Sequence, residues 1–170
     1  MEQVNSTGIK VISFSLQDEE YAIPVKQVGS IERMQQITRV PNTVSYIKGV
    51  INLSGVVTPI IDLRKRFGLQ EKAYDDSTRI IIVYYKELEL GIIVDSARDV
   101  IDIYEEDIEP TPEVIGSVDV DYIDGVTKVG NRLLILPDLE KVLEQSEKDM
   151  KVSEGKWWIS KIYLKRNLMR

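Results

Sequence analysis

The stretch VINLSGVVTPIIDL, residues 50–63, carries the clearest local information about the fold. Two apolar runs of strand length are separated by the dipeptide Ser54-Gly55. Ser-Gly pairs are typical of turns, because glycine adopts positive φ angles without steric cost. A two-residue loop is also the tightest connection between antiparallel strands. The stretch therefore predicts a β-hairpin with Ser54 and Gly55 at its tip.

Alternation of apolar and polar residues continues outside this hairpin. Ile12, Phe14 and Leu16 alternate with serines, so we expect a strand whose serines lie on its polar face. Further strands at similar spacing predict a mainly β protein. Helical signals are few: Asp62 and Asp138 are suited to cap short helices, the second over 138–146. The Arg-Lys-Arg run at 64–66 falls late in the first helix, where we expect solvated surface.

The chain contains a weak internal duplication. GVINLSGVVTPIIDL from Gly49 matches GVTKVGNRLLILPDL from Gly125, an offset of 76 positions. YAIPV at 21–25 matches LGIIV at 90–94, an offset of 69. The duplication therefore predicts two similar five-stranded lobes, over about 9–70 and 78–136. We expect each lobe to close into a barrel, because closure would remove its free edges.

Composition limits the classes of function. The chain has no cysteine and no histidine, which excludes disulfides, thiolate zinc sites and a histidine general base. The net charge is −6, and residues 95–124 hold eleven acids and one base, Arg98. Such a surface repels phosphate backbones, which argues against nucleic-acid binding. Neither a signal peptide nor a membrane-spanning run is recognisable, so we expect a cytoplasmic protein.

Catalysis would have to rest on carboxylates. Asp119 and Asp121 form the densest spaced pair, and on a strand they would share a face suited to a hard cation. A carboxylate-dependent hydrolase is therefore one alternative, and a solvated acidic loop is the other reading of the pair. Since no nucleophile motif or phosphate loop accompanies it, we predict a binding protein, with neither enzymatic activity nor metal or other cofactor.

The stretch VPNTVSYIKGVINLSGVVTPIIDLRKRFGL, residues 40–69, resembles the signature region of the CheW family of bacterial chemotaxis coupling proteins. DEEYAI, TRIIIV, GIIVDSARDVI and RLLIL follow the family pattern in order. The resemblance spans one domain over 9–146. It implies two SH3-like five-stranded β-barrel lobes packed side by side, with a few short helices. It also implies an adaptor that joins the CheW-like regulatory domain of the histidine kinase CheA to the cytoplasmic hairpin tips of methyl-accepting chemoreceptors, at receptor arrays beneath the inner membrane.

The resemblance also implies two sets of contact residues. A receptor helix would lie between the lobes, and kinase and adaptor would meet through lobe ends. Val28, Ile31 and Val100 have a second reading as core residues, and Gly49 has one as a backbone requirement. The implied receptor contacts are Val28, Ile31, Gly49, Ser54 and Val100, and the implied kinase contacts are Ile31, Arg33, Ile37, Glu109 and Val114.

Two features depart from the family pattern. The family usually has Asn-Leu-Arg-Gly at the hairpin tip, where this chain has Ser54 in place of the arginine. Either receptor coupling is altered, or Lys48 or Arg98 supplies the missing charge. Residues 147–170 form a polar linker and a tail with five bases and two tryptophans. That tail suits contact with an anionic membrane or a partner, or else it is a disordered end or cloning remnant. A CheW-like adaptor of a non-chemotaxis complex remains an alternative function.

Overall fold

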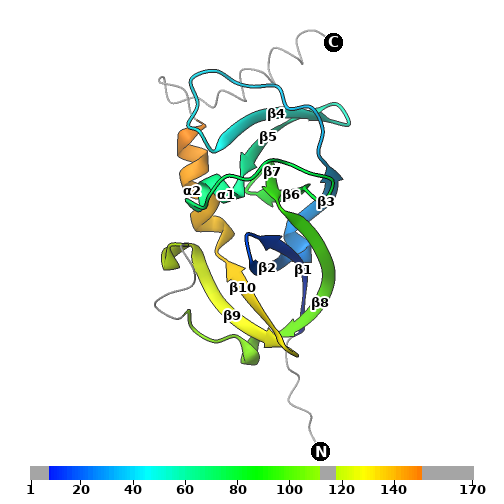
Figure 1. Cartoon of the computed structure of the whole chain (residues 1–170), viewed down its shortest axis with the longest axis vertical. Helices are drawn as coiled ribbons and strands as arrows, with labels where there is room; N and C mark the ends of the chain where they lie inside the picture. Colours follow the sequence, from blue (N-terminus) through cyan, green and yellow to red (C-terminus); the bar gives the residue numbers. More distant parts are fainter. Residues whose placement is uncertain (1–7, 112–117, 151–170) are drawn as a thin grey trace, which may run out of the picture.

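The computed structural model describes residues 8–111 and 118–150. Two five-stranded sheets follow one another along the long axis of the molecule (Figure 1). The sheet with order β8-β1-β2-β10-β9 is called lobe A, and the sheet with order β3-β6-β7-β5-β4 is called lobe B. This arrangement confirms the predicted mainly β fold with two five-stranded lobes. The strands are β1 Gly8–Leu16, β2 Glu19–Pro24, β3 Val28–Arg33, β4 Ile47–Leu53, β5 Val56–Asp62, β6 Arg79–Tyr85, β7 Leu88–Val94, β8 Ser96–Tyr104, β9 Ile123–Val129 and β10 Arg132–Pro137.

Helices are short except for the last one. Asp62 caps α1, Leu63–Arg66, by accepting a hydrogen bond from the Lys65 amide. Asp138 accepts one from the Lys141 amide at the start of α2, Leu139–Asp149. Both predicted caps are therefore confirmed, and each helix follows the last strand of a hairpin. The described residues also form three short 3-10 turns: η1 Val25–Gln27, η2 Glu105–Asp107 and η3 Val120–Tyr122.

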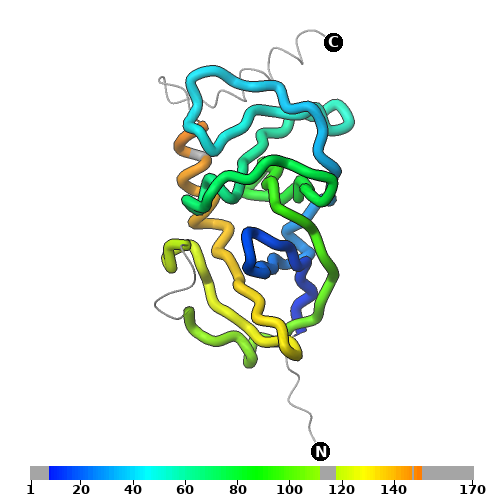
Figure 2. The backbone as a smooth tube through the Cα atoms, in the orientation of Figure 1, coloured from blue at the N-terminus to red at the C-terminus, as the bar shows by residue number. Residues whose placement is uncertain are grey.

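The lobes do not follow the order of the chain. Lobe A combines β1 and β2 with β8, β9 and β10, and lobe B takes the remaining strands. The predicted division into 9–70 and 78–136 is therefore wrong, and residues 70–77 connect α1 to β6 within lobe B. The chain crosses from lobe A to lobe B at η1 and returns after β7, as the tube in Figure 2 shows. The cause is the parallel pairing of β2 with β10 and of β7 with β5, which joins hairpins far apart in sequence.

The duplication nevertheless extends through the whole topology. Strands β1 and β2 correspond to β6 and β7 at the offset of 69, and β4 and β5 correspond to β9 and β10 at 76. Under these offsets the two sheets have the same strand order, with β3 equivalent to β8. Each half of the chain thus supplies its first hairpin to one lobe and its last three strands to the other.

Each sheet curls until its two edges meet at one point. In lobe B, Thr38 after β3 exchanges two backbone hydrogen bonds of 2.8 Å with Val50 of β4. In lobe A, Glu109 after β8 exchanges bonds of 2.8 and 3.0 Å with Val126 of β9. This closing bridge, rather than a continuous ladder, is what joins the two edges of each lobe, so neither lobe is the fully closed barrel that was predicted. The bridge still limits the exposure of the edge strands.

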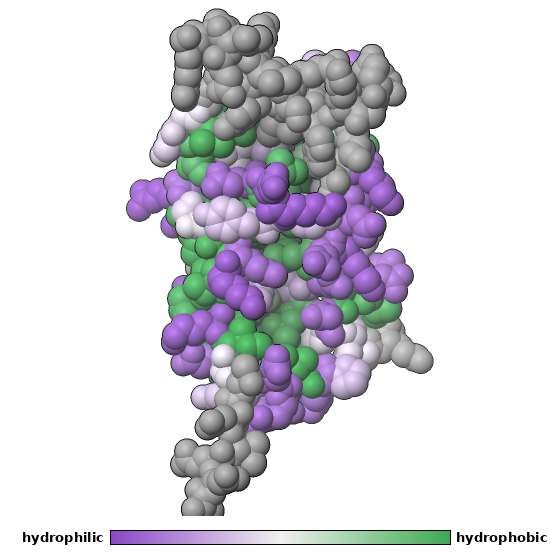
Figure 3. Space-filling model, turned by 180° about the vertical axis from the view of Figure 1, so that it is seen from behind, coloured by the Kyte–Doolittle hydropathy of each residue, from purple (hydrophilic) through white to green (hydrophobic). Residues whose placement is uncertain are grey.

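The core has three parts. The largest cluster lies between the lobes and includes Phe14 and Tyr21 of lobe A with Ile81 and Ile92 of lobe B. Two smaller clusters lie on the other faces of the sheets, one in each lobe. Apolar side chains also reach the surface in small patches among polar ones (Figure 3). In the described residues, no helix is long and apolar enough to cross a membrane.

Candidate functional site

Strands β3 and β8 are the equivalent edge strands of lobe B and lobe A, and they lie on the same side of the molecule (Figure 1). Ile31 of β3 is 42% exposed and Val100 of β8 is 60% exposed. They occupy corresponding positions, because Ile31 pairs with Ile81 and Val100 pairs with Ile12. The reading of these two residues as core is therefore wrong. The surface formed by Val28, Ile31 and Val100 is called the β3–β8 face.

Val28 differs from the other two residues of the β3–β8 face. It lies at the start of β3 directly after η1, where the chain crosses between the lobes. Its side chain is half-buried and packs against the core between the lobes. Val28 therefore anchors the face, whereas Ile31 and Val100 present apolar surface to solvent.

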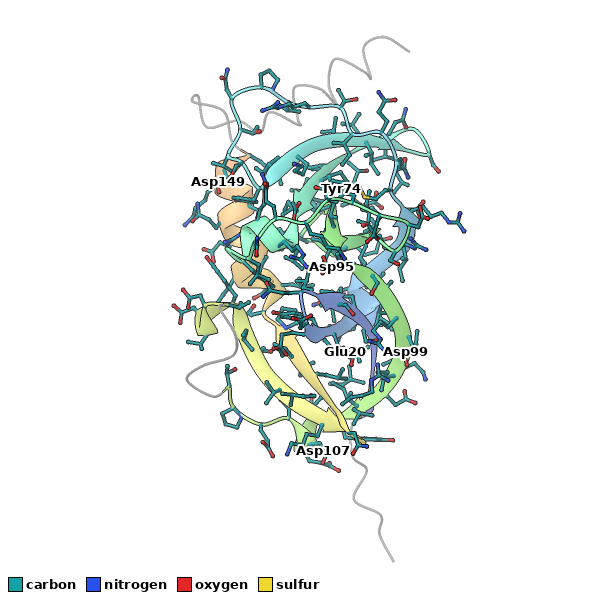
Figure 4. All side chains as sticks on the ribbon, in the orientation of Figure 1. Glu20, Tyr74, Asp95, Asp99, Asp107 and Asp149 are labelled. Carbon is teal, nitrogen blue, oxygen red and sulfur yellow. The ribbon has the colours of Figure 1, made fainter. Side chains whose placement is uncertain are left out.

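An ion pair holds the start of β8, where the chain returns from lobe B to lobe A. The Arg64 guanidinium of α1 donates bonds of 2.7 and 2.6 Å to the two carboxylate oxygens of Asp95. Asp95 also accepts a 2.7 Å bond from the Gln17 amide of the β1–β2 turn. It lies at the centre of the molecule (Figure 4). Because the pair is largely buried and bidentate, it joins both lobes at the start of β8.

Arg66 lies on the other side of α1 and is also buried. Its guanidinium donates bonds of 3.1 and 3.0 Å to the Val142 carbonyl of α2 and one of 2.8 Å to the Tyr122 hydroxyl. It also lies 4.5 Å from the Tyr122 ring centroid. The prediction of solvated surface at 64–66 is therefore wrong for Arg64 and Arg66, which tie elements together.

A polar network supports the part of β8 that carries Val100. The buried Ser13 hydroxyl donates a 2.6 Å bond to the Asp99 carboxylate. Arg132 donates a 2.8 Å bond to Asp99 and a 3.1 Å bond to Glu20. Figure 4 shows Glu20 and Asp99 side by side in lobe A. The hydrogen bonds from Arg132 and then Ser13 lower the pKa of Asp99 to about 2, and the Arg132 bond also lowers that of Glu20.

The Ser13 network was missed by sequence reasoning. The alternation of residues 12–16 places Ser13 on the polar face of its strand, whereas the structure buries it. Its partners Asp99 and Arg132 are far away in the sequence, so no local pattern indicates them. A serine is therefore compatible with burial here because its hydroxyl is satisfied by charged partners.

Gly49 is buried in β4, and its φ of +139° belongs to the region that favours glycine. A Cβ at this position would lie 2.0 Å from the Thr38 carbonyl oxygen, which takes part in the bridge that closes lobe B. Gly125 of lobe A occupies the corresponding position, where a Cβ would lie 2.9 Å from the Glu109 carbonyl oxygen. The backbone requirement therefore accounts for Gly49 without any partner.

Ser54 lies exposed at the predicted two-residue turn, which the pairing of Leu53 with Val56 confirms. Ser54 and Gly55 have φ of 49° and 89°, as in a type I′ turn. The carboxamide of Asn52 accepts a 2.8 Å bond from the Gly55 amide. The tip is therefore an ordered turn, but its serine has the positive φ that side chains disfavour.

Neither Lys48 nor Arg98, the two proposed sources of a replacement charge, places an unpaired positive charge at the hairpin tip. Lys48 lies six residues from Ser54 on β4, about 20 Å away along an extended strand. Its ammonium lies 5.9 Å from the centre of the Tyr74 ring. Arg98 lies on β8 in the other lobe, with its guanidinium 3.6 Å from Glu20.

Of the residues implied in kinase contact, Ile37 and Glu109 lie at the two closing bridges, whereas Ile31 belongs to the β3–β8 face. Arg33 is exposed at the end of β3, and Ile37 packs half-buried against the core of lobe B beside Thr38. Glu109 is exposed and forms the corresponding bridge in lobe A. Ile37 and Glu109 therefore lie at comparable places in opposite lobes. Val114 and the tail 151–170 lie outside the described residues.

The carboxylate pair at 119 and 121 does not lie on a strand. Asp119 caps the turn η3, and its Oδ1 accepts a 2.9 Å bond from the Asp121 amide. The expected same-face arrangement on a strand is therefore wrong. Over residues 8–111 and 118–150, no group of three or more acidic side chains is gathered as a metal would require.

Comparison with known proteins adds independent information. A family model described as "CheW-like domain" matches residues 10–147. The chain is 48% identical to "Chemotaxis protein CheW" of Bacillus subtilis (strain 168), over 87% of this chain and 95% of that protein. It is 40% identical to "Chemotaxis protein CheW" of Klebsiella aerogenes, over 84% and 86%. The crystal structure of the scaffolding protein TtCheW from Thermoanaerobacter tengcongensis matches with a TM-score of 0.78 and 35% identity, over 85% of this chain and 98% of that one.

Proposed function

The chain belongs to the CheW family and is a non-enzymatic scaffold of chemotaxis signalling, and from this premise we propose that it couples chemoreceptor tips to the histidine kinase CheA. The kinase partner would be the CheW-like regulatory domain, and the receptor partner would be the cytoplasmic hairpin tip. Such an adaptor works at receptor arrays beneath the inner membrane. The chemistry required is recognition by surfaces, with no bond made or broken.

The exposure of Ile31 and Val100 at corresponding positions of the two lobes is the observation that supports receptor binding most directly. An amphipathic helix docks through apolar anchors spaced along one of its faces. Two apolar residues supplied by two lobes offer such a helix two points of contact. Burying each side chain contributes about 1–2 kcal/mol.

Firm support beneath the β3–β8 face favours the same conclusion. The Arg64–Asp95 pair fixes the start of β8, and the Ser13–Asp99–Arg132 network fixes the segment beside Val100. A surface that is ordered before binding loses little conformational entropy when a partner docks. The receptor helix would therefore bind a surface that is already ordered in the free protein.

Contact with the kinase would use the lobe ends near the closing bridges. Arg33 and Ile37 in lobe B and Glu109 in lobe A combine charge with a partly exposed apolar group. Small interfaces of this kind are weak individually. In an array, each bound partner raises the effective concentration of the next, so weak contacts are sufficient.

Ser54 makes this chain a variant coupler within the proposal. Neither Lys48 nor Arg98 replaces the family's arginine at the tip, since Lys48 lies about 20 Å away and Arg98 pairs with Glu20. The substitution Ser54→Arg should strengthen receptor binding about tenfold, the effect of one charge-assisted hydrogen bond. Unchanged affinity would show that the turn has no part in receptor recognition.

The experiment that tests the function is CheA autophosphorylation with receptor fragments, measured with and without this protein. We expect a large protein-dependent increase, and its loss in Ile31→Asp and Val100→Asp because a charge replaces an apolar anchor. Leu133→Asp is the matched control, since Leu133 is 45% exposed on β10 and lies outside the proposed contacts. No increase with the unmodified chain would contradict receptor coupling.

A further inference from the structure

A hollow of about 830 Å³ opens in lobe B between the loop 34–46 and the strand β4. Its described lining includes three bases, Arg39, Lys48 and Lys65, and no acid. This is the reverse of the chain as a whole, which has 28 acidic and 22 basic residues. The size is that of pockets that bind small molecules. The charge therefore points to an anion as the ligand.

Two of the three bases lack a carboxylate partner among the described residues. Arg39 makes no hydrogen bond or ion pair there, and Lys48 has only its contact with the Tyr74 ring. Lys65 is paired with Glu71, which is mostly exposed and does not line the hollow. Like charges directed into one concave space repel each other, and a bound anion removes that repulsion.

The loop adds backbone donors to the same lining. The amides of residues 42, 44 and 45 donate no hydrogen bond to any described part of the protein, whereas the Thr43 amide belongs to the turn at 41–42. Asn42 has a φ of 65° and follows Pro41, as in a type II turn. Successive free amides in such turns bind anions in many proteins. Cationic side chains and free backbone donors therefore border one space.

Part of the lining is apolar, beside polar side chains such as Gln35 and Thr43. Ile37, Val40 and Ile47 contribute aliphatic surface, and the Tyr74 ring is held by a 2.8 Å bond from its hydroxyl to Asp62. The face of a flat aromatic ring would be accommodated against these groups while its charged substituent reached Arg39 and Lys48. We propose that the hollow is a binding site for a small phosphate ester that carries such a ring, a nucleotide in chemical class.

This site is separate from the proposed receptor contacts, because neither Ile31 nor Val100 lines it, but it shares Ile37 with the proposed kinase contact. It therefore adds a second kind of ligand to a scaffold whose other surfaces recognise proteins. A phosphate group would accept charge-assisted hydrogen bonds from the guanidinium and ammonium groups, which are roughly twice as strong as neutral ones. The ring would exclude water from those bonds.

Isothermal titration calorimetry of the full chain tests the proposal, with ADP in the absence of magnesium as the probe. We expect saturable binding at one site with a dissociation constant between roughly 1 µM and 1 mM. Adenosine tests the need for phosphate, and pyrophosphate tests the need for the ring. Each should bind at least about tenfold more weakly than ADP if both parts contribute.

Variants locate the site. Arg39→Gln and Lys48→Gln should each weaken ADP binding about tenfold, because each removes a charge-assisted bond. Lys26→Gln and Lys128→Gln are matched controls, since both are exposed bases outside the hollow. In the unmodified chain, amide NMR signals of residues 39–48 should shift with ADP, a result that needs no variant to fold. Absence of saturable binding, equal losses in the controls, or adenosine or pyrophosphate binding as tightly as ADP would overturn the proposal.

Discussion

Lobe A and lobe B share a backbone plan but differ in what stabilises them. Ser13 of β1 corresponds to Ile82 of β6, and Arg132 of β10 corresponds to Val56 of β5. Two members of the ionic network of lobe A, Ser13 and Arg132, are therefore replaced by aliphatic residues in lobe B. The strand order therefore depends on the hairpins and the glycines at the closing bridges, which both lobes keep, rather than on the residues of either interior.

The two interiors also differ in which strand of the first hairpin carries the smaller side chain. In lobe B, Gly91 admits the isoleucine cluster, because a Cβ there would lie 2.5 Å from Cδ1 of Ile60. In lobe A the corresponding residue is Ala22, and the small side chain of Ser13 replaces Ile82 opposite it. Close packing is thus maintained by a change of volume on both strands.

Replacing Ile82 by serine, which is the corresponding residue of lobe A (Ser13), should have the largest effect on the free energy of unfolding. Ile82 is 1% exposed in the lobe B cluster, so Ile82→Ser leaves a cavity and an unsatisfied hydroxyl. We expect a loss of about 3–5 kcal/mol in the free energy of unfolding, measured by urea denaturation. Ser13→Ala should cost only about 1–2 kcal/mol. Equal costs would contradict the view that the two lobes are stabilised differently.

Gly49→Ala tests a feature that both lobes share. The new methyl would meet the Thr38 carbonyl oxygen, so we expect a loss of about 3 kcal/mol in the free energy of unfolding. Gly130→Ala is the control for backbone strain alone, because its φ is +60° and no atom lies within 4 Å of the added Cβ. That variant should lose about 1 kcal/mol. If both variants lost the same amount, contact with the closing bridge would not be what requires glycine at position 49.

Arg132→Met should change how the stability of lobe A depends on pH. The pKa of Asp99 in the folded chain is about 2, below its ordinary value of about 3.9. The network therefore stabilises the fold above about pH 4, and that stabilisation is lost as the pH falls toward 2. We expect the variant to lose about 1–2 kcal/mol at pH 7 and to show a flatter decline in acid.

The matched control for Arg132→Met is Lys10→Met, which removes the exposed 3.0 Å pair with Asp102. It should change the free energy of unfolding by less than about 0.5 kcal/mol. Parallel acid-unfolding curves for the unmodified chain and Arg132→Met would mean that Asp99 does not stabilise lobe A.

Ser54→Gly should have the smallest effect. Ser54 has a φ of 49°, whereas the corresponding turn of lobe A places Gly130 at this position. Glycine relieves the strain of positive φ, so we expect a gain of about 0.5–1 kcal/mol in unfolding experiments. A loss would indicate that the serine side chain makes a contribution that the turn geometry does not explain.

Local chemistry explains how much of the fold could be predicted. The turn at Ser54-Gly55 and the caps at Asp62 and Asp138 depend on neighbouring residues, and the structure confirms all three. Lobe membership depends on the parallel pairing of β2 with β10, which no local pattern encodes. The sequence therefore indicates which hairpins form but not which hairpins share a sheet.

The candidate site shows the same division. Resemblance to the family indicated Ile31 and Val100, and the structure places both on exposed edge strands at equivalent positions. The burial of Arg66 was not predictable, since its partners Tyr122 and Val142 come from a distant segment. Charged residues in a short basic run look alike in sequence, and only the fold distinguishes those that pack from those that are solvated.

The most direct test of the account is an NMR titration of the labelled chain with a receptor hairpin fragment. If β3 and β8 form one receptor site, amide signals of β3 around Ile31 and of β8 around Val100 should shift together, with one dissociation constant for both lobes. Signals around the closing bridges at Thr38 and Glu109 should remain unchanged until the kinase regulatory domain is added. Shifts confined to a single lobe, or centred on the bridges, would contradict a receptor site shared by β3 and β8.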